Sequence, residues 1–145
     1  MSKVKVWVVI NAPPERVWAE VEDIAGHVRW MADATAIRFT SSQRSGEGTT
    51  FDCDTRFGPF KLTDKMAVTE WKPRKAMGVR HQGVVTGSGR FTLRKLRGGR
   101  TRFTWEERLS FPTWMGGRFG AFAAKPVMGW VWARNLNRLK ALAEH

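Results

Sequence analysis

Three titratable side chains lie in otherwise apolar lines of the sequence: Asp64, His81 and Glu107. The clearest case is TRFTWEERLSF, residues 101–111, where apolar and polar side chains alternate as they do along a strand with one buried side. Glu107 interrupts this pattern because it shares the apolar side with Trp105. A carboxylate in such a place can exchange a proton with a bound molecule, and a histidine can orient that molecule.

Three interpretations of these side chains remain open. They could form an acid–base site, with Glu107 as the base and His81 and Asp64 as further candidate catalytic residues. They could anchor the polar end of a ligand, with help from Asn135 on the last predicted helix. They could also be structural, either as hydrated side chains at strand ends or as a buried pair satisfied by Asn135 or a backbone N–H.

Aromatic side chains are the strongest signal in the composition, with eight tryptophans, nine phenylalanines and no tyrosine. Inward-facing aromatics and methionines can form an adaptable wall for an apolar ligand, and they can equally form an ordinary core. Besides the polar candidates His81, Glu107 and Asn135, the residues predicted to line a ligand site are Trp30, Met31, Met66, Phe91, Phe103, Trp105, Met128 and Trp132.

A glycine-rich aromatic segment, WMGGRFGAFAAKP, occupies residues 114–126. Trp114, Phe119 and Phe122 could form a lid, or an entrance that touches a membrane, beside basic side chains. The alternative is a loop whose aromatic side chains cap one end of a cavity.

The net charge of +12 is unevenly distributed, since residues 51–100 hold twelve basic and four acidic side chains while residues 1–50 hold six of each. Such a field favours nucleic acid, anionic lipid or anionic metabolites, although it also promotes solubility. The predicted aromatics point inward, so the outer face lacks the stacking platform of single-stranded RNA binders. The basic side chains assigned to that face and its loops are Lys61, Lys65, Lys72, Arg74, Lys75, Arg80, Arg90, Arg94, Arg97, Arg100, Arg102 and Arg108.

Cysteine and histidine usage excludes two kinds of site. The single cysteine, Cys53, cannot form an internal disulfide, and the three histidines lack zinc-site spacing, so neither a metal nor a cofactor is expected.

No apolar run reaches the roughly 18 residues of a membrane span. The N-terminus passes directly into a predicted strand without a cleavage site, so we expect a single domain, residues 1–145, in the cytoplasm.

The elements that position these residues follow one another without a linker or repeat. Pro126 is expected to kink or restart the last helix, and GSG at residues 87–89 is interpreted as a hairpin or bulge. Alternation and helical spacing predict strands at 4–10, 36–41, 49–57, 60–71, 77–82, 90–96 and 101–111, short helices at 11–24 and 27–31, and a long helix that ends near residue 143.

This order predicts an α+β fold with a curved seven-stranded antiparallel sheet around a long C-terminal helix and two short helices after the first strand. A curved sheet and a straight helix contact each other poorly at mid-length, so an internal cavity is expected between them. The helix side expected to face the sheet carries Ala124, Met128, Trp132, Asn135, Leu136, Leu139 and Leu142.

Three stretches resemble the START-like superfamily, also called SRPBCC: VKVWVVINAPPERVWAEVEDIAGHVRWM, AVTEWKPRKAMGVRHQGVVTGSGRFTLRKLRGGRTRFTWEERLSFP and NLNRLKALAEH. This superfamily includes the birch-pollen-allergen-like proteins and the polyketide cyclase/dehydrase and lipid transport group. The resemblance implies a helix-grip fold with an internal pocket for apolar small molecules, and it supplies no shared catalytic motif. Aromatic polyketide cyclases of this superfamily tend to hold carbonyls with hydroxyls and arginines, and the apolar lines here offer neither tyrosine nor arginine.

The first functional expectation is a non-enzymatic carrier or sensor of an apolar small molecule or lipid, held between the sheet and the last helix. Glu107, His81 and Asn135 would bind its polar end. The alternative is a cyclase- or dehydratase-like enzyme that acts on a polyketide-type substrate and uses Glu107 as acid or base. A third alternative is contact with RNA, a ribosome or an anionic membrane through the basic outer face.

Overall fold

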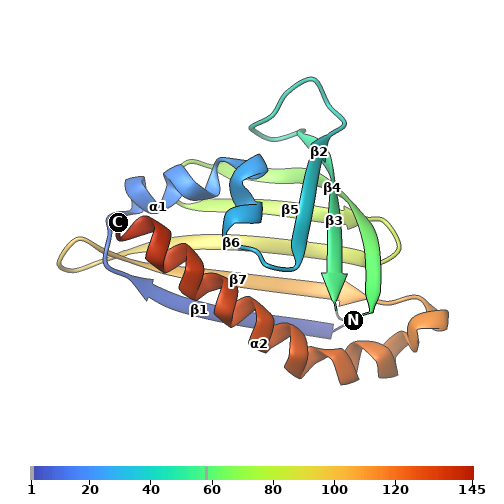
Figure 1. The fold of residues 1–145 in the computed structure, drawn as a ribbon. Helices are drawn as coiled ribbons and strands as arrows, with labels where there is room; N and C mark the ends of the chain where they lie inside the picture. Colours follow the sequence, from blue (N-terminus) through green and yellow to red (C-terminus); the bar gives the residue numbers. More distant parts are fainter. Residues whose placement is uncertain (1, 58) are drawn as a thin grey trace.

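The chain forms one antiparallel sheet crossed by a long helix (Figure 1). The computed structural model describes residues 2–57 and 59–145. Its strands are β1 (Ser2–Ile10), β2 (Ala34–Phe39), β3 (Thr50–Phe57), β4 (Phe60–Lys72), β5 (Ala76–Gln82), β6 (Thr86–Leu96) and β7 (Arg100–Ser110). Its helices are α1 (Pro14–Val21), the 3-10 helices η1 (Ile24–Arg29) and η2 (Thr113–Met115), and α2 (Gly117–Ala143).

The sheet order is β1-β7-β6-β5-β4-β3-β2, and its paired strands are antiparallel. Strands β2 to β7 are therefore a meander, and β1 joins it beside β7. The predicted seven-stranded sheet, the two short helices after the first strand and the long C-terminal helix are confirmed. The largest boundary error is in β6, which begins at Thr86 and not at residue 90, so GSG at 87–89 lies inside a strand.

Alternation of side chains gives the sheet a buried inner face and a polar outer face. On β7, Phe103 and Trp105 are buried on the inner face, whereas Arg108 is exposed on the outer face. The apolar side of α2 packs over β1 and β7, and it buries Met128, Trp132, Leu136 and Leu139. The expected helix side is confirmed, with Ala124 and Leu142 half-buried at its margins.

Pro126 does not restart the last helix, because α2 runs from Gly117 to Ala143 as one element. A proline inside a helix removes one N–H donor and leaves the carbonyl four residues earlier without its partner. Pro126 is exposed, so water can reach the carbonyl of Phe122 and satisfy it.

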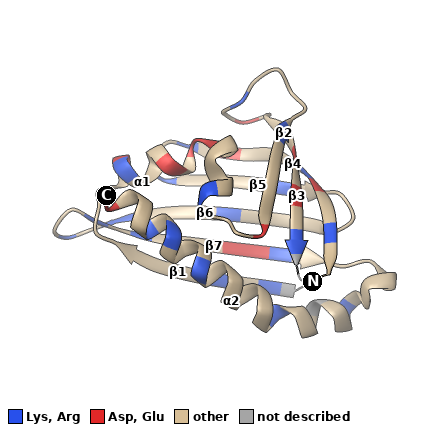
Figure 2. Cartoon of the chain, viewed as in Figure 1, with Lys and Arg blue, Asp and Glu red and all other residues tan. Residues whose placement is uncertain are grey.

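Charge is distributed unevenly over the elements. Figure 2 shows acidic positions on α1 and β7, and basic positions along α2. The sequence between Glu107 and Glu144 contains no acidic residue but six basic ones. Within residues 2–57 and 59–145, no helix combines the length and the hydropathy needed to cross a bilayer.

Candidate functional site: an acid–histidine cluster on the inner face

The structure brings Asp64, His81 and Glu107 together on the inner face of the sheet. The Nδ1–H of His81 donates to Oδ2 of Asp64 at 2.9 Å, and its Nε2–H donates to Oε2 of Glu107 at 2.8 Å. The side chains of His81 and Glu107 are 5% and 7% exposed, whereas that of Asp64 is 18% exposed. We call these three residues the acid–histidine cluster, and Asp64 is the member that solvent reaches most easily.

The contacts of His81 favour its charged form. A neutral imidazole has one N–H, but both ring nitrogens here face carboxylate oxygens, so both bonds form only in the imidazolium. Burial by itself lowers the pKa of His81, but the hydrogen bonds and negative charges of Asp64 and Glu107 outweigh burial and raise that pKa to about 10. With two carboxylates and one imidazolium, the cluster carries one net negative charge.

Gly89 makes room for Glu107 to reach His81. Glu107 is paired with Gly89 on β6, and β6 separates β7 from β5, which carries His81. A Cβ atom at position 89 would lie 2.3 Å from Oε1 of Glu107, inside the space that the carboxylate occupies. The GSG pattern predicted a hairpin or bulge at this glycine, and its role beside Glu107 was missed. The sequence did contain a signal for this role, because a glycine lies opposite a predicted buried acid on the neighbouring strand.

Trp105 fixes the other oxygen of Glu107. Its Nε1–H donates to Oε1 of Glu107 at 2.9 Å, and its ring stacks on Trp132 of α2 with centroids 4.9 Å apart. Glu107 is therefore held from two sides, by the imidazole and by the indole.

Aromatic rings fill the space beneath the middle of α2. Trp30 is fully buried, and its ring centroid lies 5.7 Å from Phe91, 6.2 Å from Phe103 and 6.0 Å from Trp105. The curvature of the sheet predicted a cavity here, a prediction based only on the contact between the sheet and the last helix. Trp30 comes from the connection between η1 and β2, and it occupies the gap that sheet curvature would otherwise leave.

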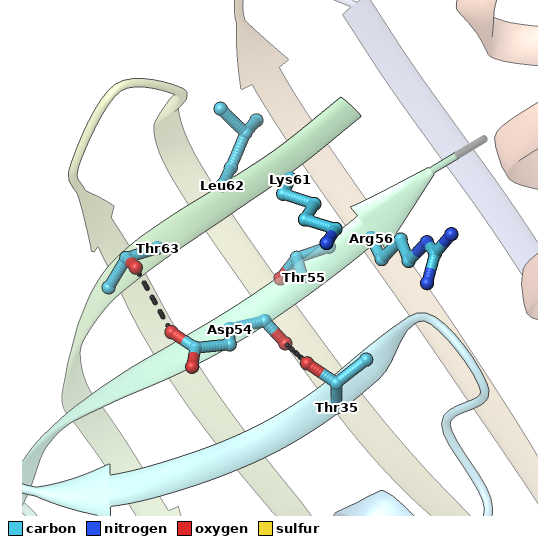
Figure 3. Close-up of a pocket in the computed structure, with 7 residues that line it drawn as sticks. All are labelled: Thr35, Asp54, Thr55, Arg56, Lys61, Leu62 and Thr63. Carbon is cyan, nitrogen blue, oxygen red and sulfur yellow. Dashed lines mark hydrogen bonds between the residues drawn. The ribbon is translucent and has the colours of Figure 1, made fainter. Parts of the chain in front are cut away.

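The two best-defined hollows among the described residues lie elsewhere. One, of about 490 Å³, is on the outer face of the sheet, and it is lined by Lys5, Ser88, Gly89, Arg90, Thr92, Thr104, Glu106 and Arg108. The other, of about 430 Å³, lies at the ends of β2, β3 and β4 (Figure 3), and it is lined by Thr35, Asp54, Thr55, Arg56, Lys61, Leu62 and Thr63. Most residues in both linings are of polar types, unlike those expected for an apolar cavity.

Asn135 does not join the acid–histidine cluster. Its Nδ2–H donates to Oδ1 of Asp33 at 2.7 Å, and its Oδ1 accepts from the backbone N–H of Ala32 at 3.0 Å. Trp132 Nε1–H also donates to Asp33, at 3.3 Å. Burial raises the pKa of Asp33, and these hydrogen bonds partly offset the rise. Asn135 thus ties α2 to the segment before β2. Asp33 was not a predicted residue, because it precedes the strand and breaks no alternation.

The inner face beside Asp64 is only partly covered. Met66, which is paired with His81, is half-buried, and so are Leu62 and Val79. Asp64 Oδ1 is itself buried and has no hydrogen-bond partner among the described residues. An apolar strip next to a charged cluster is a chemically suitable surface for a molecule with one polar end.

The remaining predicted ligand residues fall into two groups. Phe91, Phe103, Trp105, Met128 and Trp132 are buried in the core, whereas Met31 is half-buried at its margin. The three residues predicted to form a lid or entrance do not lie in a loop that caps a cavity. Trp114 lies in η2, Phe119 and Phe122 lie in α2, and all three are exposed.

Within residues 2–57 and 59–145, no three His, Cys, Asp or Glu side chains are arranged so that they could hold a metal ion. The other buried histidine, His27, is structural: its Nε2–H donates to the carbonyl of Val21 at 2.6 Å, and burial lowers its pKa to about 4.

Basic side chains on the outer face are partly neutralised. Arg90 bonds Glu70 at 2.7 Å, and Arg108 lies 3.4 Å from Glu106. The prediction that aromatics point inward was wrong for Trp7, which is 54% exposed on the outer side of β1. Arg102 lies over one face of that indole, 4.2 Å from the ring centre, so a base cannot stack on this face.

Solved structures share this fold at low sequence identity. The crystal structure of TTHA0849 from Thermus thermophilus is 18% identical, with a TM-score of 0.77 over 97% of this chain and 96% of that one. Hypothetical protein jhp0584 from Helicobacter pylori is 17% identical, with a TM-score of 0.78 over 97% and 87% of the two chains. A protein from Thermobifida fusca is 16% identical, with a TM-score of 0.77 over 99% and 93%. These similarities concern the fold.

The evidence for the family comes from a family model that covers nearly the whole chain. Comparison with curated proteins gives no match. The family model described as polyketide cyclase / dehydrase and lipid transport matches residues 1–144, and the helix-grip arrangement agrees with the solved structures. The resemblance seen in the sequence is thereby confirmed, and the chain belongs to the polyketide cyclase/dehydrase and lipid transport family.

Proposed function

We propose that this protein binds an apolar small molecule or lipid on the inner face of the sheet, with the polar end of the ligand at the acid–histidine cluster. The observation that carries the proposal is a buried, charged cluster on an otherwise apolar face. Separating such charges from water is unfavourable, so their presence calls for a role beyond packing. The family description, which includes lipid transport, supports the same class of ligand.

The ligand is proposed to lie beside the cluster and not beneath the middle of α2. Trp30 and its aromatic neighbours occupy the latter space. Leu62, Met66 and Val79 are half-buried and flank Asp64 and His81, so they offer apolar surface within reach of the cluster.

The charge of the cluster favours a polar end that donates hydrogen bonds. His81 already donates both N–H groups to Asp64 and Glu107, and Oδ1 of Asp64 is a buried acceptor without a donor among the described residues. A hydroxyl or amine can donate to that oxygen, whereas a carboxylate would add a second negative charge near it. We therefore propose alcohols or amines in preference to fatty acids.

A displacement assay tests this proposal. The neutral apolar fluorophore N-phenyl-1-naphthylamine should bind the protein, and 1-decanol should displace it at least about tenfold more effectively than decanoate, which corresponds to about 1.4 kcal/mol. Native mass spectrometry of the freshly purified protein should also detect a co-purified apolar molecule.

Glu107→Gln should weaken decanol binding by about threefold to tenfold, because His81 loses one of its two charged partners and the cluster rearranges. Glu106→Gln is the matched control, since Glu106 precedes Glu107 on the same strand but faces outward. Equal displacement by decanol and decanoate, or equal effects of the two variants, would contradict the proposed site. Retained binding in a more stable Glu107→Leu variant would do so as well.

A second candidate function is proton transfer, favoured by the placement of His81 between two carboxylates at 2.9 and 2.8 Å. A cyclase- or dehydratase-like enzyme of this kind would remove a proton next to a carbonyl group. Exchange of the α-hydrogens of 2-decanone in D₂O, followed by NMR, tests it. An enzyme should accelerate this exchange and lose the acceleration in Glu107→Gln, whereas a carrier should leave the exchange rate unchanged.

A further inference from the structure

The N-terminal half of α2 carries an apolar stripe on its solvent side. Phe119, Phe122, Pro126 and Trp130 are spaced by three or four residues, which places them on one side of a helix. Phe119 is 87% exposed, Phe122 is 77% exposed and Trp130 is 61% exposed. The buried residues of α2, such as Trp132, lie on the opposite side. Large aromatic side chains grouped in this way on a surface mark an interaction site.

Basic side chains border this stripe, and acidic ones are absent from the segment. Arg118 and Lys125 lie on the same half of α2, and both are exposed. The guanidinium of Arg134 lies 4.8 Å from the ring centre of Trp130. The sequence has no Asp or Glu between Glu107 and Glu144, and α2 appears in Figure 2 with basic positions along its length. We call Phe119, Phe122, Trp130, Arg118 and Lys125 the basic aromatic stripe.

Charge decides which partner fits this surface. A second copy of the chain would bring another basic stripe and another net charge of +12, so two copies would repel each other here. An anionic lipid surface offers apolar depth for the aromatic rings and negative headgroups for the arginine and lysine side chains.

We propose that the basic aromatic stripe docks the protein, with α2 parallel to the surface, on membranes that contain anionic lipids. Helices that lie in the membrane interface combine aromatic residues with basic residues, and on α2 the basic residues border the aromatic ones. The surface is separate from the outer face of the sheet, where Arg90 and Arg108 are already paired with acidic side chains. Docking through α2 does not depend on the ligand proposed above.

Vesicle flotation tests the docking surface. The protein should float with phosphatidylcholine vesicles that contain phosphatidylglycerol and remain unbound with pure phosphatidylcholine, and added salt should weaken binding. Phe119→Ser combined with Phe122→Ser should lower binding by about tenfold or more, because the two rings supply the apolar contact. The side chains are exposed, so the variant should unfold at the same temperature as the wild type.

Two matched variants make the test specific. Trp7→Ser combined with Phe60→Ser removes two aromatics that are 54% and 56% exposed elsewhere, and it should leave vesicle binding unchanged. Arg118→Glu combined with Lys125→Glu should abolish binding to anionic vesicles. Lys61→Glu combined with Lys65→Glu, which changes the net charge equally on the outer face of the sheet, should reduce it far less.

Three results would overturn the proposal. These are equal binding to neutral and anionic vesicles, absence of binding to both, and equal losses in the α2 and control variants. If sedimentation showed that the wild type is a dimer and that Phe119→Ser with Phe122→Ser is a monomer, the occupant would be a second copy, and the membrane proposal would be wrong.

Discussion

At the residue scale, one glycine and one indole determine whether the acid–histidine cluster can form. Gly89 leaves the space through which Glu107 crosses β6, and Trp105 holds the carboxylate oxygen that His81 does not use. The contact between Glu107 and His81 therefore depends on the absence of a side chain at position 89. This dependence explains how an acid can be buried in the alternating pattern of β7.

Gly89→Ala should displace Glu107 and break its bond to His81, because the new Cβ would lie 2.3 Å from Oε1. We expect the free energy of unfolding to fall by about 1–3 kcal/mol, as it does when buried polar groups lose partners. Gly129→Ala is the control: its Cβ would lie 3.8 Å from Val4, and alanine should stabilise α2 by up to about 1 kcal/mol. Urea unfolding measures both. Similar small effects of the two substitutions would show that Glu107 does not need the space above Gly89.

The charge of His81 should make stability depend on pH. Its pKa is raised from 6.5 to about 10 in the folded protein, so the folded state keeps a proton that the unfolded state releases. This stabilisation is complete below about pH 6.5 and is lost as pH rises through 10. Urea unfolding between pH 7 and 10 should therefore show a falling free energy of unfolding, and His81→Gln should flatten the curve. Parallel curves for the two proteins would contradict a charged His81. His27 does not interfere, because its lowered pKa of about 4 affects stability only below pH 6.5.

At the element scale, two kinds of contact fix α2: apolar packing on the sheet and hydrogen bonds to the segment before β2. Its apolar side packs on β1 and β7, and Asn135 and Trp132 bind Asp33 in the segment before β2. The second contact links the last helix to the segment that also delivers Trp30 into the core. The helix, the η1–β2 connection and the inner face of the sheet are thus fixed together.

Asn135→Ala should lower the free energy of unfolding by about 2 kcal/mol, since it removes the hydrogen-bond partners of Asp33 Oδ1 and of the Ala32 N–H. Asn137→Ala is the matched control, because Asn137 is exposed on the same helix and should change stability by less than about 0.5 kcal/mol. Thermal or urea unfolding distinguishes them. Equal effects would show that the Asn135 bonds contribute nothing specific.

Local patterns predicted the elements better than they predicted what lies between them. Alternation identified the strands and the inward position of Glu107, since a strand's period is visible in a short stretch. The start of β6 was missed because Gly87 and Gly89 have no side chains to alternate. Two features depend on contacts between segments that are distant in the sequence, and a local pattern cannot predict them. Trp30 fills the expected cavity, and Asn135 binds Asp33.

At the scale of the whole molecule, the proposed ligand surface and the proposed membrane surface lie on different sides of α2. The inner face of the sheet offers Leu62, Met66 and the acid–histidine cluster, whereas the solvent side of α2 offers the basic aromatic stripe. A protein that docks through the helix would keep the outer face of the sheet turned away from the bilayer. Binding and docking can therefore be measured separately in the same chain.

NMR of the protein with ¹⁵N-labelled histidine tests the central claim most directly, because it observes the cluster itself. On addition of 1-decanol, the ring resonances of His81 should shift in proportion to ligand bound, while those of His27, hydrogen-bonded to Val21, and of His145 should stay in place. If decanol binds, as shown by displacement of the fluorophore, and the resonances of His81 do not move, the acid–histidine cluster does not bind the polar end of the ligand.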